Sequence, residues 1–356
     1  MHVFLNWLNR HLQNPQVVAL IFLLLIGFTI IVIWGEMLAP VLAGVVLAYL
    51  LEGVVSRLER RRVPRFAAVL LVFLTFLAFF LFMLLALVPL LWQQVVQLFQ
   101  QLPSMISWAQ RELLYLPERY PEFITEKQVV SIMAALRSEL TTTGQHVLSL
   151  SVASVRTIIM ALIYVFIVPL LVFFLLKDKD RILDWFASIL PNDRKLIAEV
   201  WHEVDQQIGN YIRGKVWEIF IVWAVSFFTF RALGLQFAIL ISLFVGLSVL
   251  VPIIGATVMA VPVALIGYFQ WGWSSEFVYA VVAYVILQIL DGNLLAPLLF
   301  SGVVNLHPVA ITSAVLVFGG MWGFWGIFFA IPLAALIQAV MKAILRQREG
   351  VDYPAE

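Results

Sequence analysis

The chain has 356 residues, of which 63% are hydrophobic and 12% are charged, and its formal net charge is +1. A globular protein is about a quarter charged, so this composition cannot supply a water-facing surface and predicts an all-α polytopic membrane protein. The near-zero charge, without a basic stripe, argues against a nucleic-acid partner. The sequence contains no cysteine, which excludes disulfides and thiolate metal ligands. No cofactor, metal site or ATP-binding loop is indicated.

Apolar segments of membrane-spanning character follow one another along the chain, since a bilayer core needs roughly 20 helical residues. The first are 17–34, 37–55, 66–92, 152–176 and 216–233. The later ones are 237–251, 253–270, 277–299, 308–320 and 323–341. Several of the later segments are short for a full crossing. We therefore expect about eight membrane segments, including broken or re-entrant helical hairpins in the C-terminal half. Glu36 would lie in a tight turn between the first two spans.

Short basic loops predict the orientation, because positively charged loops remain in the cytoplasm. Residues 56–65 contain five arginines and one glutamate. Both chain ends carry basic residues as well, which predicts that both termini are cytoplasmic. By alternation, residues 93–151 lie outside and residues 177–215 lie inside. The outer segment begins as an amphipathic helix from Trp92, is broken at 116–121, and continues as a second polar helix over 126–144.

A polar stretch at 288–308 interrupts an apolar region, 236–341, whose only charged residues are Glu276 and Asp291. A charged Asp at the centre of a bilayer costs roughly 2.5–3.5 kcal/mol, so Asp291 requires a partner, a proton or a water-filled cavity. This region contains no Lys or Arg, so a cationic partner must come from elsewhere, such as Arg213 or Arg231. Such an acid could bind and release a proton as its surroundings alternate between wet and dry.

The polar residues of this stretch form a candidate solute or ion pathway. Gln288 lies one helical turn before Asp291 and shares its face. The full candidate set is Asp291, Gln288, Asn293, Ser301, Asn305 and His307. A structural role is the alternative: Asp291 and Asn293 would satisfy a broken backbone, while Asn305 would cap the helix that begins near Pro308. Glu218, close to the inner surface, is a weaker candidate.

Glycines and prolines in the last third predict hinges and broken helices, because proline removes a backbone hydrogen bond and glycine loosens the chain. The candidate positions are Pro252, Gly255, Pro262, Gly292, Pro297, Gly320, Gly323, Gly326 and Pro332. The stretches VMAVPVALI and FFAIPLAALI, at 258–266 and 328–337, form a faint internal echo. Broken helices in corresponding positions are typical of transporter substrate sites, although such an echo also arises by chance.

Several motifs occur in a characteristic order: NYIRGK, LGLQFA, VPIIG, QILDGNLLAPLLFSGVVNLHP and GMWGFWGIFFAIP. Together they resemble the autoinducer-2 exporter family of bacterial inner-membrane permeases, most closely its PerM-type branch. The resemblance implies a multi-pass secondary transporter of the inner membrane that exports small polar solutes. It also implies a homo-oligomer, for which a pentamer is one candidate. Some members resemble signal exporters and others resemble cation/proton antiporters, so the substrate stays open.

The resulting organisation has six parts. They are N-terminal membrane helices at 1–92, an extramembrane helical insertion on the periplasmic side at 93–151, a transmembrane helix at 152–176, a cytoplasmic amphipathic segment at 177–215, a transport region with broken helices at 216–341 and a cytoplasmic tail at 342–356.

Three functional hypotheses follow. The first is a secondary transporter that moves small polar solutes or ions, with proton coupling as one option. The second is a channel or cation/proton antiporter in which Asp291 binds the ion, and the third is a membrane scaffold that transports nothing. The sequence does not favour an enzyme, because aspartyl intramembrane proteolysis needs paired acids and only one deep acid is visible.

Overall fold

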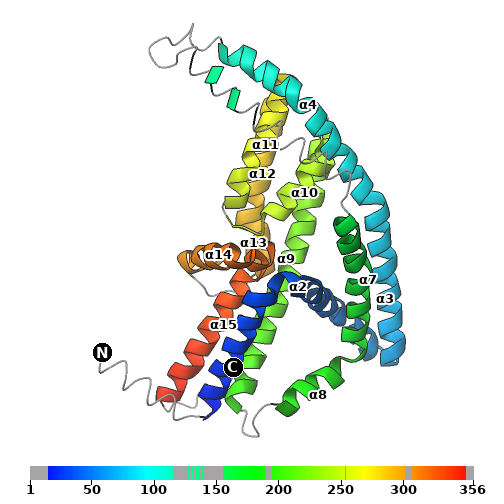
Figure 1. Cartoon of the computed structure of the whole chain (residues 1–356), viewed down its shortest axis with the longest axis vertical. Coiled ribbons are helices and arrows are strands. Elements are labelled where there is room, and N and C mark those ends of the chain that lie inside the picture. Colours follow the sequence, from blue (N-terminus) through cyan, green and yellow to red (C-terminus); the bar gives the residue numbers. More distant parts are fainter. Residues whose placement is uncertain are drawn as a thin grey trace.

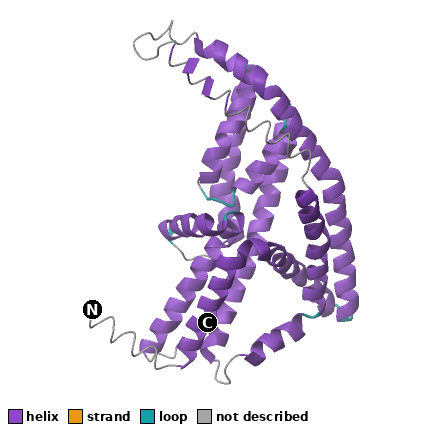
Figure 2. Cartoon of the chain, viewed as in Figure 1, coloured by secondary structure: helices purple, strands orange, loops and turns teal. Residues whose placement is uncertain are grey.

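The computed structural model describes residues 15–114, a few positions between 127 and 138, and residues 155–189, 195–252, 254–300 and 307–349. Those residues are helical and contain no strand (Figure 2). Helices long and apolar enough to cross a membrane lie at Met37–Arg60, Arg65–Arg111, Asp205–Leu233, Ile254–Trp271, Ser275–Phe300 and Phe324–Met341. Shorter apolar helices lie at Leu162–Lys177, Ala238–Ser248 and Val309–Trp322. The predicted all-α polytopic membrane fold is therefore confirmed.

The first helix, α2, runs without interruption over Pro15–Arg60. The tight turn predicted at Glu36 is wrong, because Glu36 lies inside this helix. Pro40 is also inside it, and Figure 1 shows α2 changing direction part-way along its length. An internal proline bends a helix rather than ending it when the flanking residues favour the helix. Helical continuity also keeps the backbone hydrogen-bonded, which an apolar environment demands.

The next helical segment is also longer than predicted. It comprises α3 at Arg65–Phe82, a π-helical turn η1 at Met83–Leu87 and α4 at Val88–Leu114. At 1.5 Å per residue this rod is about 75 Å long, more than twice the thickness of a bilayer core. The predicted amphipathic helix is present as α4, but it continues the span instead of following a boundary at residue 92. The predicted break at 116–121 and most of 126–144 lie outside the described residues.

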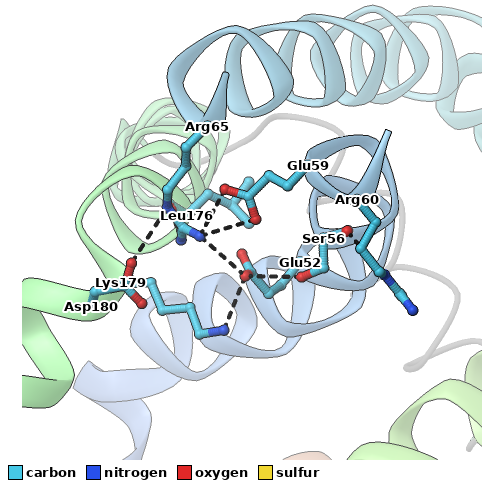
Figure 3. A network of polar contacts seen from close by, with 8 residues as sticks. All are labelled: Glu52, Ser56, Glu59, Arg60, Arg65, Leu176, Lys179 and Asp180. Atoms are coloured by element: carbon cyan, nitrogen blue, oxygen red, sulfur yellow. Dashed lines mark hydrogen bonds and ion pairs between the residues drawn. The ribbon is translucent and has the colours of Figure 1, made fainter. Parts of the chain in front are cut away.

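A polar network joins the α2–α3 loop to the α7–α8 junction, where α7 covers Val155–Lys177 and α8 covers Lys179–Ile189. Arg65 is at its centre (Figure 3). Its guanidinium lies 3.6 Å from Glu52, 3.3 Å from Glu59 and 3.7 Å from Asp180, and donates to the Leu176 carbonyl at 3.0 Å. Lys179 adds a 3.0 Å contact to Glu52. The two loops that alternation assigned to the same membrane side therefore meet here.

Helix α9, Lys195–Leu233, is the central element of the C-terminal half and contacts α2, α10, α12, α13 and α15. The predicted boundary at residue 215 lies inside this helix, so the amphipathic segment and the following span are one rod. Helix α10, Ala238–Ser248, crosses α9 closely. A Cβ added at Gly246 would lie 2.9 Å from the Ile219 carbonyl oxygen, so only glycine permits this approach.

Among the apolar cores that hold the helices together, two include side chains of the α3–α4 rod. One lies between α2, α3 and α7, around Val55, Val69 and Val172. The other lies between α9, α10, α11 and α12, around Phe230 and Val245, where α11 covers Ile254–Trp271. Partly buried side chains of α4 complete the second core. The long α3–α4 rod thus packs against both halves of the molecule.

The predicted helix break at Gly292 is wrong. Helix α12, Ser275–Leu290, continues through a π-helical turn, η2 at Asp291–Leu295, into α13 at Ala296–Phe300. The turn is widened, and the Ala296 amide donates to the Asp291 carbonyl five residues earlier. Both π turns of the described chain end two residues before a proline, Pro89 or Pro297. A proline cannot donate and its ring displaces the carbonyl four residues back, which a wider turn accommodates.

The last two helices form a hairpin. Helix α14, Pro308–Trp322, and α15, Phe324–Glu349, meet at Gly323, whose φ of 58° favours glycine. Figure 1 shows α14 lying crosswise to α9 and α15. Among the other predicted hinge positions, Pro252 lies between α10 and α11, outside any helix, whereas others are inside helices. Pro262 lies in α11, Gly320 in α14 and Pro332 in α15, so none of these three interrupts its helix.

The α10–α11 and α14–α15 hairpins are built alike. In each, a glycine in the first turn of the second helix touches the end of the first helix: Gly255 meets the Ser248 carbonyl and Gly326 meets the Phe318 carbonyl. A Cβ at either glycine would overlap that carbonyl oxygen. The two similar sequence stretches around Pro262 and Pro332 therefore belong to hairpins with the same glycine contact. Each proline follows its glycine within two helical turns.

Candidate functional site

A cavity of ≈ 320 Å³ lies where α9 meets the end of α10 and the η2 turn. This volume is within the range of small-ligand pockets. The lining residues are Tyr211, Lys215, Glu218, Ser248, Val249, Val251, Pro252, Ala256, Gln288, Asp291, Gly292, Ala296, Phe300, Ile311 and Ile331. Most are apolar, and the ionisable carboxyl and amino groups come from α9 and η2 alone. The break between α10 and α11 forms part of the wall through Val249, Val251 and Pro252.

The strongest polar contact in the cavity is a buried ion pair on α9. The Lys215 Nζ lies 2.6 Å from Glu218 Oε2, and each residue is only 3% exposed. The same ammonium donates to the Val249 carbonyl at 2.7 Å and lies 5.3 Å from the centre of the Phe300 ring. Val249 follows the last residue of α10, where carbonyl groups lack helical partners and attract a cation. Lys215 therefore joins α9 to the broken end of α10.

This ion pair was not predicted from the sequence. Lys215 was predicted to lie at the end of a cytoplasmic segment and Glu218 close to the inner surface. The predicted cationic partners of Asp291 were Arg213 and Arg231, but both are exposed, and Arg213 bonds Asn210 at 3.1 Å. The available signal was the spacing of three residues between Lys215 and Glu218, which places both on one helix face. Because α9 continues through residue 215, that face is turned into the protein.

Asp291, Gln288 and Gly292 also line the cavity. Asp291 lies within electrostatic range of both Lys215 and Glu218. Among the described residues, neither Asp291 Oδ1 nor Gln288 Nε2 has a hydrogen-bond partner, although both atoms are buried. The hydroxyl of Tyr211 is in the same condition, on a side chain only 2% exposed. The cavity thus contains an acceptor and two groups that can donate, all available to a ligand.

Two other predicted pathway residues, Asn293 and His307, are not brought into this cavity. Asn293 is exposed, and its Nδ2 donates to the Ile289 carbonyl at 2.9 Å, which satisfies a backbone group beside the π turn. His307 is exposed and caps α14 by accepting from the Val309 amide at 3.3 Å. The predicted cap was Asn305. Asn305 and Ser301 both lie outside the described residues.

Close packing of α9 against α13 fixes the cavity's shape. A Cβ added at Gly214 would lie 2.7 Å from Phe300 and 3.2 Å from the Leu299 carbonyl oxygen. Glycine at this position lets Phe300 approach α9, where it covers the Lys215 ammonium and stacks near Tyr211 at 5.8 Å. The aromatic wall and the ion pair therefore depend on the same helix contact.

A second cavity, of ≈ 590 Å³, lies between α2 and the α14–α15 hairpin. Its lining includes Trp34, Trp322, Trp325 and Phe329 and contains no ionisable side chain. No group of three metal-ligating side chains occurs in the part of the chain that the structure describes. The first cavity, with its lysine and two carboxyl groups, is therefore the candidate site for a polar solute.

Helices crossing a membrane around a charged internal cavity define the class: a multi-pass membrane transport protein. The chain belongs to the AI-2E family transporters, whose family model matches residues 18–346. It is 41% identical to the "Putative permease PerM" of Escherichia coli (strain K12), over 96% of this chain and 97% of that protein. It is 25% identical to the "Putative transport protein YueF" of Bacillus subtilis (strain 168), over 92% and 90% of the two chains. A "Putative transport protein" of Thermotoga maritima is 26% identical, over 91% and 93%.

Proposed function

We propose that the chain is a secondary transporter that moves small polar solutes or ions across the bacterial inner membrane through the Asp291 cavity. One observation carries the proposal. The carboxyl groups of Glu218 and Asp291 and the ammonium of Lys215 line one cavity at the broken end of a helix, and only Glu218 is paired with the lysine. A carboxylate left over at membrane depth requires a proton, an ion or a solute beside it.

Asp291 is the proposed coupling group. When its carboxyl is neutral, it offers a donor to a solute, and when it is ionised, it offers a charge to a cation. Exchange between these states, as the cavity opens to one side or the other, would link proton movement to solute movement. The Lys215–Val249 contact joins α9 to the α10–α11 hairpin, so we propose that these elements move as one unit.

The orientation and assembly are parts of the same proposal. Both termini are cytoplasmic, as is the Arg65 network, whose basic residues match the positive-inside rule. The segment after α4 is periplasmic. The chain functions as a homo-oligomer, and it is a transporter rather than an enzyme. The names of the relatives, which speak of permeation and transport, support this reading.

A channel or antiporter that uses Asp291 as its ion-binding acid is the second candidate. The unpartnered Asp291 oxygen favours it over a scaffold, since a purely structural acid would be expected to have a hydrogen-bond partner. The channel differs from the secondary transporter in coupling, because a channel conducts ions down their gradient without moving protons. An antiporter exchanges a cation for protons and shares the coupling.

The test is solute flux in liposomes that contain the purified protein and a pH-sensitive dye. We expect Asp291→Asn to abolish proton-coupled movement while insertion and assembly stay intact. Glu276→Gln is the matched control, because it removes an exposed carboxylate from the start of the same helix. Wild-type flux in Asp291→Asn would contradict the role of Asp291. Ion flux without proton movement would favour a channel, and no flux of any solute would favour a scaffold.

A further inference from the structure

We propose that the Asp291 cavity binds a small organic ammonium ion, which rests on and deepens the proposed function by naming its substrate class. The three ionisable carboxyl and amino groups of the cavity are Lys215, Glu218 and Asp291. With all three ionised, their sum is one negative charge. A cation neutralises that charge, whereas an anion doubles the imbalance.

The Lys215 ammonium is not available to an anionic ligand. It has three N–H groups. Two are directed to Glu218 at 2.6 Å and to the Val249 carbonyl at 2.7 Å, and the ammonium also lies over the Phe300 ring at 5.3 Å. A phosphate or carboxylate would have to displace one of these contacts from a side chain that is 3% exposed. The cavity's only cation is therefore already in use, among the residues described.

The groups that remain are those of a cation receptor. Asp291 Oδ1 is a buried acceptor without a partner, and an ammonium N–H would give it a charge-assisted hydrogen bond. Tyr211 is 2% exposed, and its unpartnered hydroxyl can accept a second N–H. Gln288 Nε2 can donate to a hydroxyl or carbonyl oxygen elsewhere on the same ligand.

The cavity is also too large and too apolar for a bare metal ion. Its volume of ≈ 320 Å³ corresponds to about ten water molecules at ~30 Å³ each. Val251, Ile311 and Ile331 also line it, and the Tyr211 and Phe300 rings are 5.8 Å apart beside the ion pair. This combination of one carboxylate, aromatic rings and aliphatic wall suits an alkyl chain that carries a primary ammonium group.

Binding should compete with a proton at Asp291. A carboxylate can hold either the proton or the ammonium ion, so apparent affinity falls as the pH is lowered and rises as the pH is raised. The other titratable groups that face Asp291 are Tyr211, Lys215 and Glu218, all on α9. The lining residues of α10, α11, α14 and α15 are not titratable. An ammonium ion that binds where Asp291 was protonated would displace that proton, which is the exchange that a proton-coupled transporter needs.

The experiment is titration calorimetry of the full chain in detergent with four probes: n-butylammonium, butyrate, 1-butanol and sodium ion. We expect saturable binding of n-butylammonium alone, tighter at pH 8 than at pH 6. Asp291→Asn should weaken binding roughly tenfold or more, since a charge-assisted bond is lost. Asp291→Glu should retain it, Tyr211→Phe should weaken it less, and Glu276→Gln should leave it unchanged.

Several outcomes would overturn the inference. These are equal binding of butyrate or 1-butanol, sodium binding that displaces n-butylammonium, or undiminished binding by a folded Asp291→Asn variant that elutes as wild type. No binding of n-butylammonium, together with intact proton-coupled flux, would reject this substrate class and leave the transport proposal standing. Binding without flux of any solute would reject transport and leave the site.

Discussion

Two charge clusters of the described chain differ in solvent exposure and in their partners, which together set how much each contributes to stability. The Arg65 network joins α2, α3, α7 and α8 through several partly exposed side chains, of which Arg65 and Glu52 each have more than one partner (Figure 3). The Lys215–Glu218 pair lies inside the α9–α15 half, nearly free of solvent. Exposed charge networks contribute little to stability and tolerate substitution. Removing one partner of a buried pair leaves the other charge buried without a partner, which destabilises the folded state. The buried cluster is thus the one that substitutions should reveal.

The largest effect is expected from Lys215→Met, which leaves Glu218 buried beside Asp291 without a cation. The expected loss is about 3–5 kcal/mol, as for other buried pairs broken on one side. It would appear as a lower melting temperature of the purified protein. Lys215→Met/Glu218→Leu should recover much of the loss, because both charges are gone. A Lys215→Met variant as stable as the wild type would show that the Lys215–Glu218 pair does not contribute to stability in this way.

A smaller effect is expected from Gly255→Ala, which brings a Cβ against the Ser248 carbonyl within the α10–α11 hairpin. Overpacking of this kind costs about 1–3 kcal/mol, and more where only backbone can move. Gly320→Ala is the matched control, because no atom lies within 4 Å of its added Cβ. That control should stabilise α14 by roughly 0.5–1 kcal/mol through helix propensity. Equal melting temperatures for the two variants would contradict the close contact.

The smallest effect is expected from Lys179→Met in the Arg65 network. Lys179 is 40% exposed and lies 3.0 Å from Glu52, which Arg65 also approaches. Exposed pairs contribute about 0–1 kcal/mol and weaken as salt screens them. The melting temperature should change slightly more between low and high ionic strength for the wild type than for the variant. A loss as large as that of Lys215→Met would remove the distinction between the two clusters.

Composition and periodicity predicted the membrane fold, because lipid requires long apolar helices whatever the tertiary contacts are. The turn predicted at Glu36 was wrong, and the boundaries predicted at Trp92 and Lys215 fall inside continuous helices. Each was inferred from local polarity, yet a helix runs through all three positions, since backbone hydrogen bonding favours continuity over a turn at one polar residue.

The site was predicted in part. Gln288, Asp291 and Gly292 share a face by spacing alone, and a buried acid in an apolar span indicates function. Lys215 and Glu218 could not be assigned to the same cavity, because their partners come from α10 and η2, far along the chain. Asn293 and His307 are polar for local reasons: one satisfies a helix carbonyl and the other caps a helix. Composition does not distinguish those roles from ligand binding.

Cysteine labelling can test directly whether a water-accessible, cation-selective cavity surrounds Asp291. The chain has no natural cysteine, so Ser248→Cys places one thiol in the cavity wall. Ser104→Cys, on an exposed part of α4, reports the background reactivity. Labelling uses the cationic 2-aminoethyl and the anionic 2-sulfonatoethyl methanethiosulfonates.

We expect the thiol at position 248 to react faster with the cationic reagent than with the anionic one, relative to the thiol at position 104. Adding Asp291→Asn should abolish that preference, and n-butylammonium should slow the labelling. A thiol at position 248 that reacts with neither reagent would show that the cavity is closed to water. A thiol that prefers the anionic reagent with Asp291 in place would show that the cavity is not cation-selective.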